Sequence, residues 1–150
     1  MGECAGMVVC PGGHPEPGAL AMERPAAAAE QQAWQQAIRA ELWNSVINEI
    51  EEETGIPKSE LEQPVCIGVV RRVENNRPNM MFVVRCRLSA EQVKLKYRDA
   101  SDKYESTGVF FLDKEELIDQ ALRDMSLRMP GCHRGGVQLY ATYLKFRDEK

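Results

Sequence analysis

An acidic run near residue 50 contains the side chains best suited to chemistry in this chain. In the stretch Asn-Glu-Ile-Glu-Glu-Glu-Thr-Gly, residues 48–55, four of five consecutive positions are glutamates. On a helix, Glu49, Glu52 and Glu53 share one stripe, because residues three and four positions apart are neighbours on the helix surface. Glu51 faces away from that stripe, and we expect it to be solvated.

Two interpretations of the acidic stripe remain open from spacing alone: a solvated helix end or a site for a divalent cation. Carboxylates in the last turn face the negative end of the helix dipole, which costs up to about 1 kcal/mol each. Neighbouring carboxylates about 6 Å apart also repel each other by roughly 3 kcal/mol before screening, at an effective dielectric near 20. A hard cation such as Mg²⁺ reverses that repulsion, since it prefers carboxylate oxygen. Charge runs on helix surfaces, however, commonly serve solubility.

The glutamates come at the end of a long predicted helix. Residues from about 27 to 54 are rich in the strong helix formers Ala, Gln and Glu, and Pro25 stands where a helix can start. The first part of this segment is alanine-rich and of low complexity, so the prediction rests on the part from about Ala37. Gly55 and Pro57 end the helix. The residues expected on its buried face are Leu42, Trp43, Val46, Ile47 and Ile50.

The rest of the chain predicts a mixture of strands and helices. Two apolar, β-branched segments, 64–73 and 79–88, are joined by an Asn-rich turn and read as paired strands. Ser89 is a good N-cap for a following helix. The remaining expected elements are a short strand at 7–10, a helix at 89–100, a buried strand at 106–113, an amphipathic helix at 114–127 and a closing helix or strand at 135–148. This mixture is typical of a layered α/β or α+β domain.

Composition argues against several classes of partner. The net charge of −4 offers no basic surface for nucleic acid, and no apolar run approaches the roughly 20 residues that span a bilayer. Five cysteines without a Cys-x-x-Cys pair favour reduced thiols in an intracellular protein, cytoplasmic or nuclear. We interpret Cys132 and His133 as ordinary loop residues rather than metal ligands. The oligomeric state is left open.

Two motifs together resemble the split signature of the Nudix hydrolase family. Residues 48–56 match the second half, Arg-Glu-aliphatic-x-Glu-Glu-x-Gly-aliphatic, at every fixed position except the first, where Asn48 replaces arginine. Residues 11–18, Pro-Gly-Gly-His-Pro-Glu-Pro-Gly, match the first half. Ala19 then stands in place of a glutamate, and an insertion of about 21 residues, at about 20–40, separates the two halves.

The resemblance implies a Nudix-type α/β/α sandwich with a mixed sheet. Only about ten residues precede the glycine turn, so we expect a partial Nudix domain over residues 1–150, truncated at its amino terminus and lacking its first strands. The implied ligands of Mg²⁺, or of Mn²⁺, are Glu49, Glu52 and Glu53. The carbonyl of Gly13 is a weaker candidate ligand, and Glu41 is a candidate replacement for the missing glutamate.

Downstream segments are similar to the branch of the family that hydrolyses UDP-sugars, over residues 12 to 143. That similarity implies metal-dependent hydrolysis of UDP-glucose or UDP-galactose to UMP and the sugar 1-phosphate. The candidate catalytic residues are Glu49, Glu53 and Glu105, the last as a base or an extra ligand. Two alternatives remain: a Nudix pyrophosphatase for another nucleotide, and a noncatalytic remnant that acts as a binding or structural protein.

Overall fold

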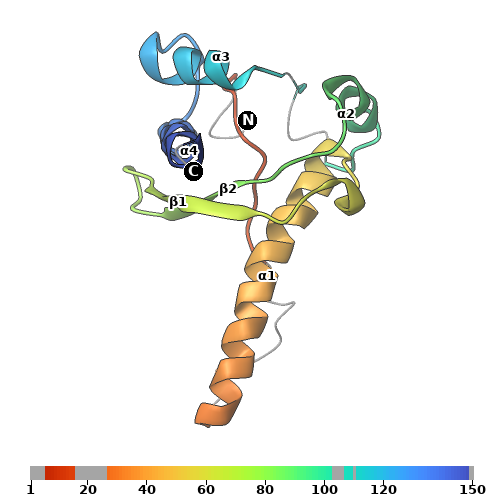
Figure 1. Ribbon diagram of the computed structural model, residues 1–150, viewed down its shortest axis with the longest axis vertical. Coiled ribbons are helices and arrows are strands. Elements are labelled where there is room, and N and C mark those ends of the chain that lie inside the picture. Colours follow the sequence, from red (N-terminus) through yellow and green to blue (C-terminus); the bar gives the residue numbers. More distant parts are fainter. Residues whose placement is uncertain (1–5, 16–26, 103–106, 110, 149–150) are drawn as a thin grey trace. The chain divides into compact units, whose positions relative to one another are not determined.

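The computed structural model describes residues 6–15, 27–102, 107–109 and 111–148. Within these ranges the chain mixes helices with a two-stranded antiparallel sheet, in agreement with the expected α/β class (Figure 1). None of the helices in the described ranges is long and apolar enough to cross a membrane. In chain order the elements are α1 (Ala28–Thr54), a 3₁₀ turn η2 (Lys58–Glu60), β1 (Val65–Arg71), β2 (Pro78–Val83), α2 (Ala90–Tyr97), α3 (Lys114–Ile118), a π-helical turn η4 (Asp119–Arg123) and α4 (Gly131–Asp148).

These elements form two compact units, which we describe separately. One unit consists of the described residues within Met1–Cys10, Val65–Arg85 and Phe110–Lys150, and contains the hairpin, α3, η4 and α4. The other consists of the described residues within Pro11–Pro64 and Cys86–Val109, and contains α1, η2 and α2.

In the unit that contains α1, the end of this helix packs against α2. Gly55 follows α1 with a left-handed φ of 70°, and its N–H donates to the carbonyl oxygen of Glu51 at 2.8 Å. A Cβ on Gly55 would come within 2.5 Å of the backbone oxygen of Lys96, so both the conformation and the close approach favour glycine. The predicted helix boundary at Gly55 is therefore confirmed. The buried apolar residues of this unit are Ile56, Val93 and Ala100.

Two further local features of this unit agree with the sequence. Ser89 begins α2 with a capping box: its hydroxyl accepts the N–H of Gln92 at 3.3 Å, and the Gln92 side chain accepts the N–H of Ser89 at 2.8 Å. Trp43, expected on the buried face of α1, donates from Nε1 to the carbonyl oxygen of Pro64 at 3.0 Å. This bond ties α1 to the segment that precedes β1.

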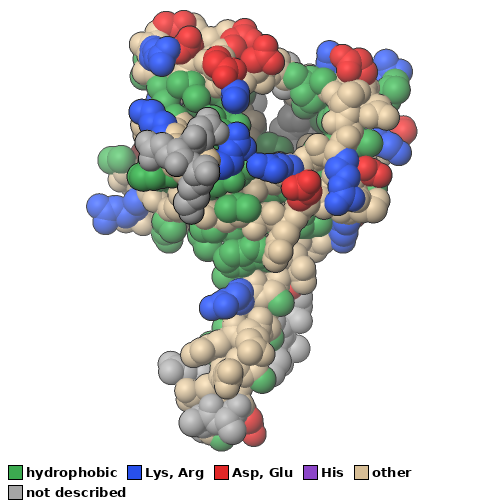
Figure 2. All heavy atoms as spheres, in the orientation of Figure 1, with side chains coloured by type: hydrophobic (Ala, Val, Ile, Leu, Met, Phe, Trp, Pro, Cys, Tyr) green, Lys and Arg blue, Asp and Glu red, His purple; other side chains and the backbone are tan. Residues whose placement is uncertain are grey.

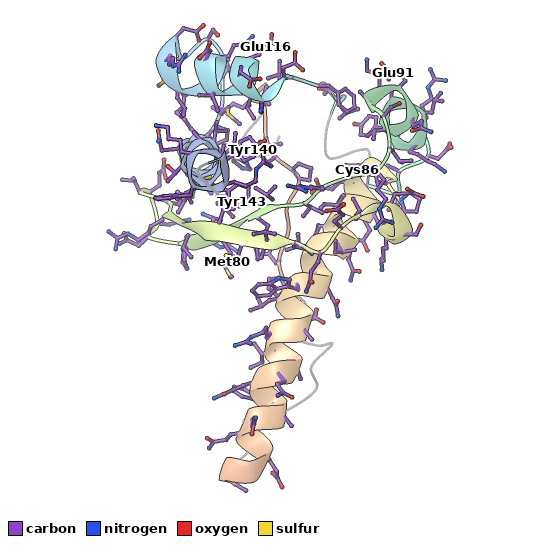
Figure 3. The ribbon with its side chains drawn as sticks, viewed as in Figure 1. Met80, Cys86, Glu91, Glu116, Tyr140 and Tyr143 are labelled. Atoms are coloured by element: carbon purple, nitrogen blue, oxygen red, sulfur yellow. The ribbon has the colours of Figure 1, made fainter. Side chains whose placement is uncertain are left out.

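In the other unit, α4 packs on one face of the β1–β2 hairpin (Figure 1). Two glycines of α4 allow the close approach: a Cβ on Gly135 would lie 2.7 Å from Val70, and one on Gly136 would lie 3.0 Å from Met81. On the opposite face, Met80 points away from α4 (Figure 3) and is paired in register with the exposed Val69. The buried apolar residues of this unit are Ala121, Leu127, Met129, Val137 and Leu144, of which the first four form one cluster.

Several expected elements of this unit differ from those observed. No strand forms within 107–109 or 111–113, the described parts of the segment expected to be a buried strand. Residues 7–10 form no strand either, although the N–H of Val8 donates to the carbonyl oxygen of Arg128 at 2.8 Å. A strand is stable only when its backbone groups find a partner strand, which an apolar pattern cannot reveal.

The amphipathic helix expected at 114–127 is shorter than predicted. It runs as α3 and then as η4, which ends at Arg123. The Asp124 carboxylate accepts both the N–H and the hydroxyl of Ser126, at 2.9 and 2.7 Å, and Met125 adopts a left-handed φ of 59°. Such side-chain bonds to the backbone compete with helix continuation.

Acidic and basic side chains gather on the exposed face of α3 (Figure 2), where Lys114 and Glu115 form an ion pair at 3.5 Å.

Candidate functional site

Two carboxylates at the end of α1 lie against the glycine segment Pro11–Gly13. The N–H of Gly12 donates to Oε1 of Glu53 at 3.4 Å, across a sequence separation of 41 residues. Gly13 lies so close to Glu49 that a Cβ there would be 1.8 Å from Oε1 and 2.3 Å from Oε2. Both glutamates are half-buried and stand one helical turn apart. The structure thus brings together the two halves of the motif that the sequence separates by an insertion.

The backbone around Glu53 is held by the end of α1. The Thr54 hydroxyl donates to the carbonyl oxygen of Ile50 at 2.5 Å and accepts the N–H of Ile56 at 3.3 Å. Thr54 and Ile56 are both buried, and Gly55 makes the turn between them. These contacts fix the last turn of α1, so the direction in which the Glu53 side chain leaves the helix is set by buried groups.

Glu52 differs from its two neighbours on the predicted stripe. Its side chain is exposed, while its carbonyl oxygen accepts the hydroxyl of Ser101 at 3.2 Å and the N–H of Asp102 at 3.0 Å. Within the described residues, no group of three or more His, Cys, Asp or Glu side chains is arranged to hold a metal ion. The geometry therefore groups Glu49 with Glu53, and the role of Glu52 as a ligand remains a prediction.

The expectation that Glu51 is simply solvated is wrong. Its Oε1 accepts the N–H of Lys58 at 3.2 Å, and its Oε2 lies 3.6 Å from the Lys58 ammonium. Glu51 therefore ties the helix end to the 3₁₀ turn η2. The last turn of α1 contains no basic residue of its own, so the helix dipole opposes the acidic side chains there, as inferred from the sequence.

The donor set around Gly13 suits a hard divalent cation. Mg²⁺ is commonly bound through one or two carboxylates, with water and substrate phosphate completing its shell, and the pair Glu49 and Glu53 meets that requirement. The absence of a side chain at Gly13 leaves the Glu49 carboxylate directly against the backbone.

Glu41 is about 18 Å from Glu53 along the helix axis. That separation is too long for the two carboxylates to share one ion. Glu105 lies outside the described residues.

Sequence reasoning missed one contact of the segment that leads into the glycines. His133, which we expected in a loop, lies in the first turn of α4, and its Nδ1 accepts the N–H of Cys10 at 3.0 Å. Burial first, and then the positive charge of Arg72, lowers the pKa of His133 from its ordinary value. No local pattern could have predicted a bond between residues 123 positions apart.

Comparisons with known proteins agree with the motif, although no protein-family model matches the chain. Nudix hydrolase 9 of Arabidopsis thaliana is 38% identical over 148 residues, which cover 97% of this chain and 46% of that protein. The uridine diphosphate glucose pyrophosphatases of Homo sapiens and Bos taurus are 33% and 31% identical over 143 residues, 93% of this chain. The chain spans about half the length of these curated relatives. Over nearly its whole length, the chain is therefore homologous to Nudix hydrolase 9.

Proposed function

We propose that this chain provides the metal-binding part of a Nudix pyrophosphatase that cleaves the diphosphate of UDP-sugars, UDP-glucose or UDP-galactose, to UMP and the sugar 1-phosphate. The observation that carries the proposal is the contact of Glu49 and Glu53 with the glycine segment. The substrate class is supported by the printed names of the human and bovine relatives, which are UDP-glucose pyrophosphatases.

The residues of the site have two proposed roles: some bind the cation, and the others keep its ligands in place. Glu49 and Glu53 would hold Mg²⁺, or Mn²⁺, which when bound neutralises diphosphate charge and lowers the pKa of water. The N–H of Gly12 orients the Glu53 carboxylate, and Gly13 leaves room for Glu49. Glu52 is proposed as a further ligand, and Glu105 as a base or an extra ligand.

Two other functions have a specific observation in their favour. The Arabidopsis relative, with 38% identity, has a name that gives no substrate, which leaves room for a pyrophosphatase acting on another nucleotide. The chain matches only about half of each relative, which leaves room for a noncatalytic protein that keeps the metal helix as a binding or structural module. Assays with UDP-glucose, UDP-galactose and ADP-ribose separate the first alternative from the proposal.

The test compares two neighbouring glutamates that have different contacts. UMP release from UDP-glucose is measured with and without Mg²⁺ for the chain, for Glu53→Gln and for Glu51→Gln. We expect Mg²⁺-dependent turnover that falls at least about 100-fold in Glu53→Gln. Mutation of residues that only hydrogen-bond to metal ligands already lowers metal affinity or activity by about 10- to 100-fold. Glu51→Gln should keep its turnover, because its carboxylate contacts Lys58. A folded chain that binds Mg²⁺ but hydrolyses none of UDP-glucose, UDP-galactose and ADP-ribose would favour the noncatalytic alternative.

A further inference from the structure

Residues 6–10 run alongside the segment that leads into α4. The N–H of Val8 donates to the carbonyl oxygen of Arg128 at 2.8 Å, and the N–H of Cys10 donates to Nδ1 of His133 at 3.0 Å. Val8 also packs against the buried cluster of this unit. The two bonds follow the same direction along both segments, so Cys10 lies at the first turn of α4. All of these residues belong to the unit that contains the hairpin.

This contact brings together two cysteines from distant parts of the sequence. Cys132 immediately precedes His133 in the first turn of α4. Cys10 and Cys132 are both free, and the first is exposed while the second is half-buried. Burial of the Cys10 thiol first, and then the neighbouring Cys132, raises the pKa of Cys10. A charge shifts a pKa noticeably only at close range, so this shift agrees with a short separation between the two thiols.

We propose that Cys10 and Cys132 are a redox-sensitive pair, which a small-molecule disulfide such as glutathione disulfide converts into a reversible bond that fastens residues 6–10 to α4. Disulfide closure needs Cα atoms about 4.4 to 6.8 Å apart. Residues 6–10 form neither helix nor strand, so Cys10 can approach Cys132 without disrupting an element of the unit. The pair lies within one unit and does not depend on the proposed cation site.

The bond forms by two successive thiol–disulfide exchanges. The raised pKa keeps the Cys10 thiol protonated near neutral pH, so Cys132 reacts first. Its thiolate attacks one sulfur of glutathione disulfide, and one glutathione leaves and takes up the proton. Cys10 then loses its proton, attacks the Cys132 sulfur and displaces the second glutathione. In that step Cys132 no longer carries the charge that raises the pKa of Cys10. Two protein thiols are oxidised, and one glutathione disulfide is reduced to two thiols.

The experiment uses the full chain with Cys4→Ser as the parent, because Cys10 is then the first cysteine and is followed only by Cys66 and later ones. The parent is compared with chains that also carry Cys10→Ser, Cys132→Ser or Cys66→Ser. Cys66 is the matched control, since it is an exposed free cysteine of the same unit, on β1. Each chain is incubated with glutathione disulfide in buffer and in concentrated urea. Protease digestion and mass spectrometry then identify every bond and adduct.

We expect the folded parent and Cys66→Ser to form the bond between Cys10 and Cys132 in at least about 10-fold excess over other intramolecular pairs, because disulfides form only between thiols that the fold holds close together. This preference should be lost in urea. Cys10→Ser should stop at a glutathione adduct on Cys132, and Cys132→Ser should accumulate less adduct on Cys10.

The same mixture of pairs with and without urea, or adducts on both cysteines of the parent without a bond between them, would overturn the proposal. This comparison uses the parent alone, so it does not require either single variant to fold. Equal adduct formation in Cys10→Ser and Cys132→Ser would overturn the order of the two exchanges.

The effect of the bond on the fold is measured by thermal unfolding. A bond that closes a long loop restricts the unfolded chain, so oxidation of the parent should raise its melting temperature by about 5 °C or more. Dithiothreitol should reverse the rise, and Cys132→Ser should not show it. Equal melting temperatures of the oxidised and reduced parent would contradict the fastening role. Neither measurement involves Mg²⁺ or UMP release, so failure of this inference and failure of the proposed function are distinguishable.

Discussion

Substituting Gly13 with alanine should damage the cation site while leaving the fold intact. The added Cβ would lie 1.8 Å from Oε1, 2.0 Å from Cδ and 2.3 Å from Oε2 of Glu49. Ordinary contacts between heavy atoms are about 3.5 Å, so the carboxylate must retreat by about 1.5 Å or more. At Gly12, a Cβ would meet no heavy atom within 4 Å. Gly12→Ala therefore adds the same methyl group one residue away without the collision.

The expected magnitudes differ for folding and for binding. The atoms in the way belong to the flexible end of a side chain, so rotation of Glu49 relieves the collision. We expect the free energy of unfolding of Gly13→Ala to change by less than about 1 kcal/mol, because Gly→Ala also stiffens the unfolded chain. Disturbing the groups that orient metal ligands typically lowers metal affinity by about 10- to 100-fold, and here a ligand itself is displaced. Mg²⁺ affinity should therefore fall by about 100-fold, or about 2.8 kcal/mol.

The assay pairs Mg²⁺ titration calorimetry with thermal unfolding for the wild type, Gly12→Ala and Gly13→Ala. The reasoning predicts near-equal melting temperatures for all three proteins and weak binding by Gly13→Ala alone. If Gly13→Ala binds Mg²⁺ as tightly as Gly12→Ala, Glu49 is not a ligand at the observed position. A large fall in melting temperature would instead show that the close approach of Gly13 to Glu49 serves folding.

Three further predictions concern stability. Gly55→Ala should lower the free energy of unfolding by about 2 kcal/mol or more in urea denaturation, because its φ of 70° is strained for alanine and its Cβ would meet the Lys96 backbone oxygen at 2.5 Å; unchanged stability would contradict the observed helix end. Ser89→Ala should cost about 1 kcal/mol by removing the hydroxyl that caps the Gln92 N–H, and an equal midpoint in urea would show that the cap is not formed. The depressed pKa of His133 means that the unfolded chain binds this proton at higher pH than the folded chain. Stability should therefore decrease as pH falls below about 6.5 and level off below the folded pKa, and His133→Asn should lose that part of the slope measured by urea denaturation across pH.

Short sequence patterns predicted where helices begin and end better than they predicted which elements pack against each other. Gly55 ends α1 and Ser89 caps α2, because both act through backbone conformation and short-range bonds that the sequence displays directly. The closing segment was ambiguous between helix and strand, since Gly135 and Gly136 weaken a helical pattern. Both glycines are present in α4 because Val70 and Met81 of the hairpin approach them closely. That reason is tertiary, and no window of sequence contains it.

The candidate site could also be predicted only in part, because some of its contacts are local and others depend on distant parts of the chain. Helical spacing places Glu49 and Glu53 on one side of α1, and the split motif indicated that the glycine segment would join them. Helical spacing could not distinguish a solvated Glu51 from one that contacts Lys58, because that contact depends on where the chain turns after Pro57. The bond from Cys10 to His133 likewise depends on the packing of a distant helix.

The central claim is that Glu49 and Glu53 together hold a divalent cation. The most direct measurement is a Mn²⁺ titration monitored by electron paramagnetic resonance, with Mg²⁺ added as a competitor. It is made on the wild-type chain, on the double variant Glu49→Gln/Glu53→Gln and on Glu51→Gln. We expect saturable binding that Mg²⁺ displaces in the wild type and in Glu51→Gln, and no such binding in the double variant. Equal Mn²⁺ affinity in the wild type and the double variant would contradict the claim.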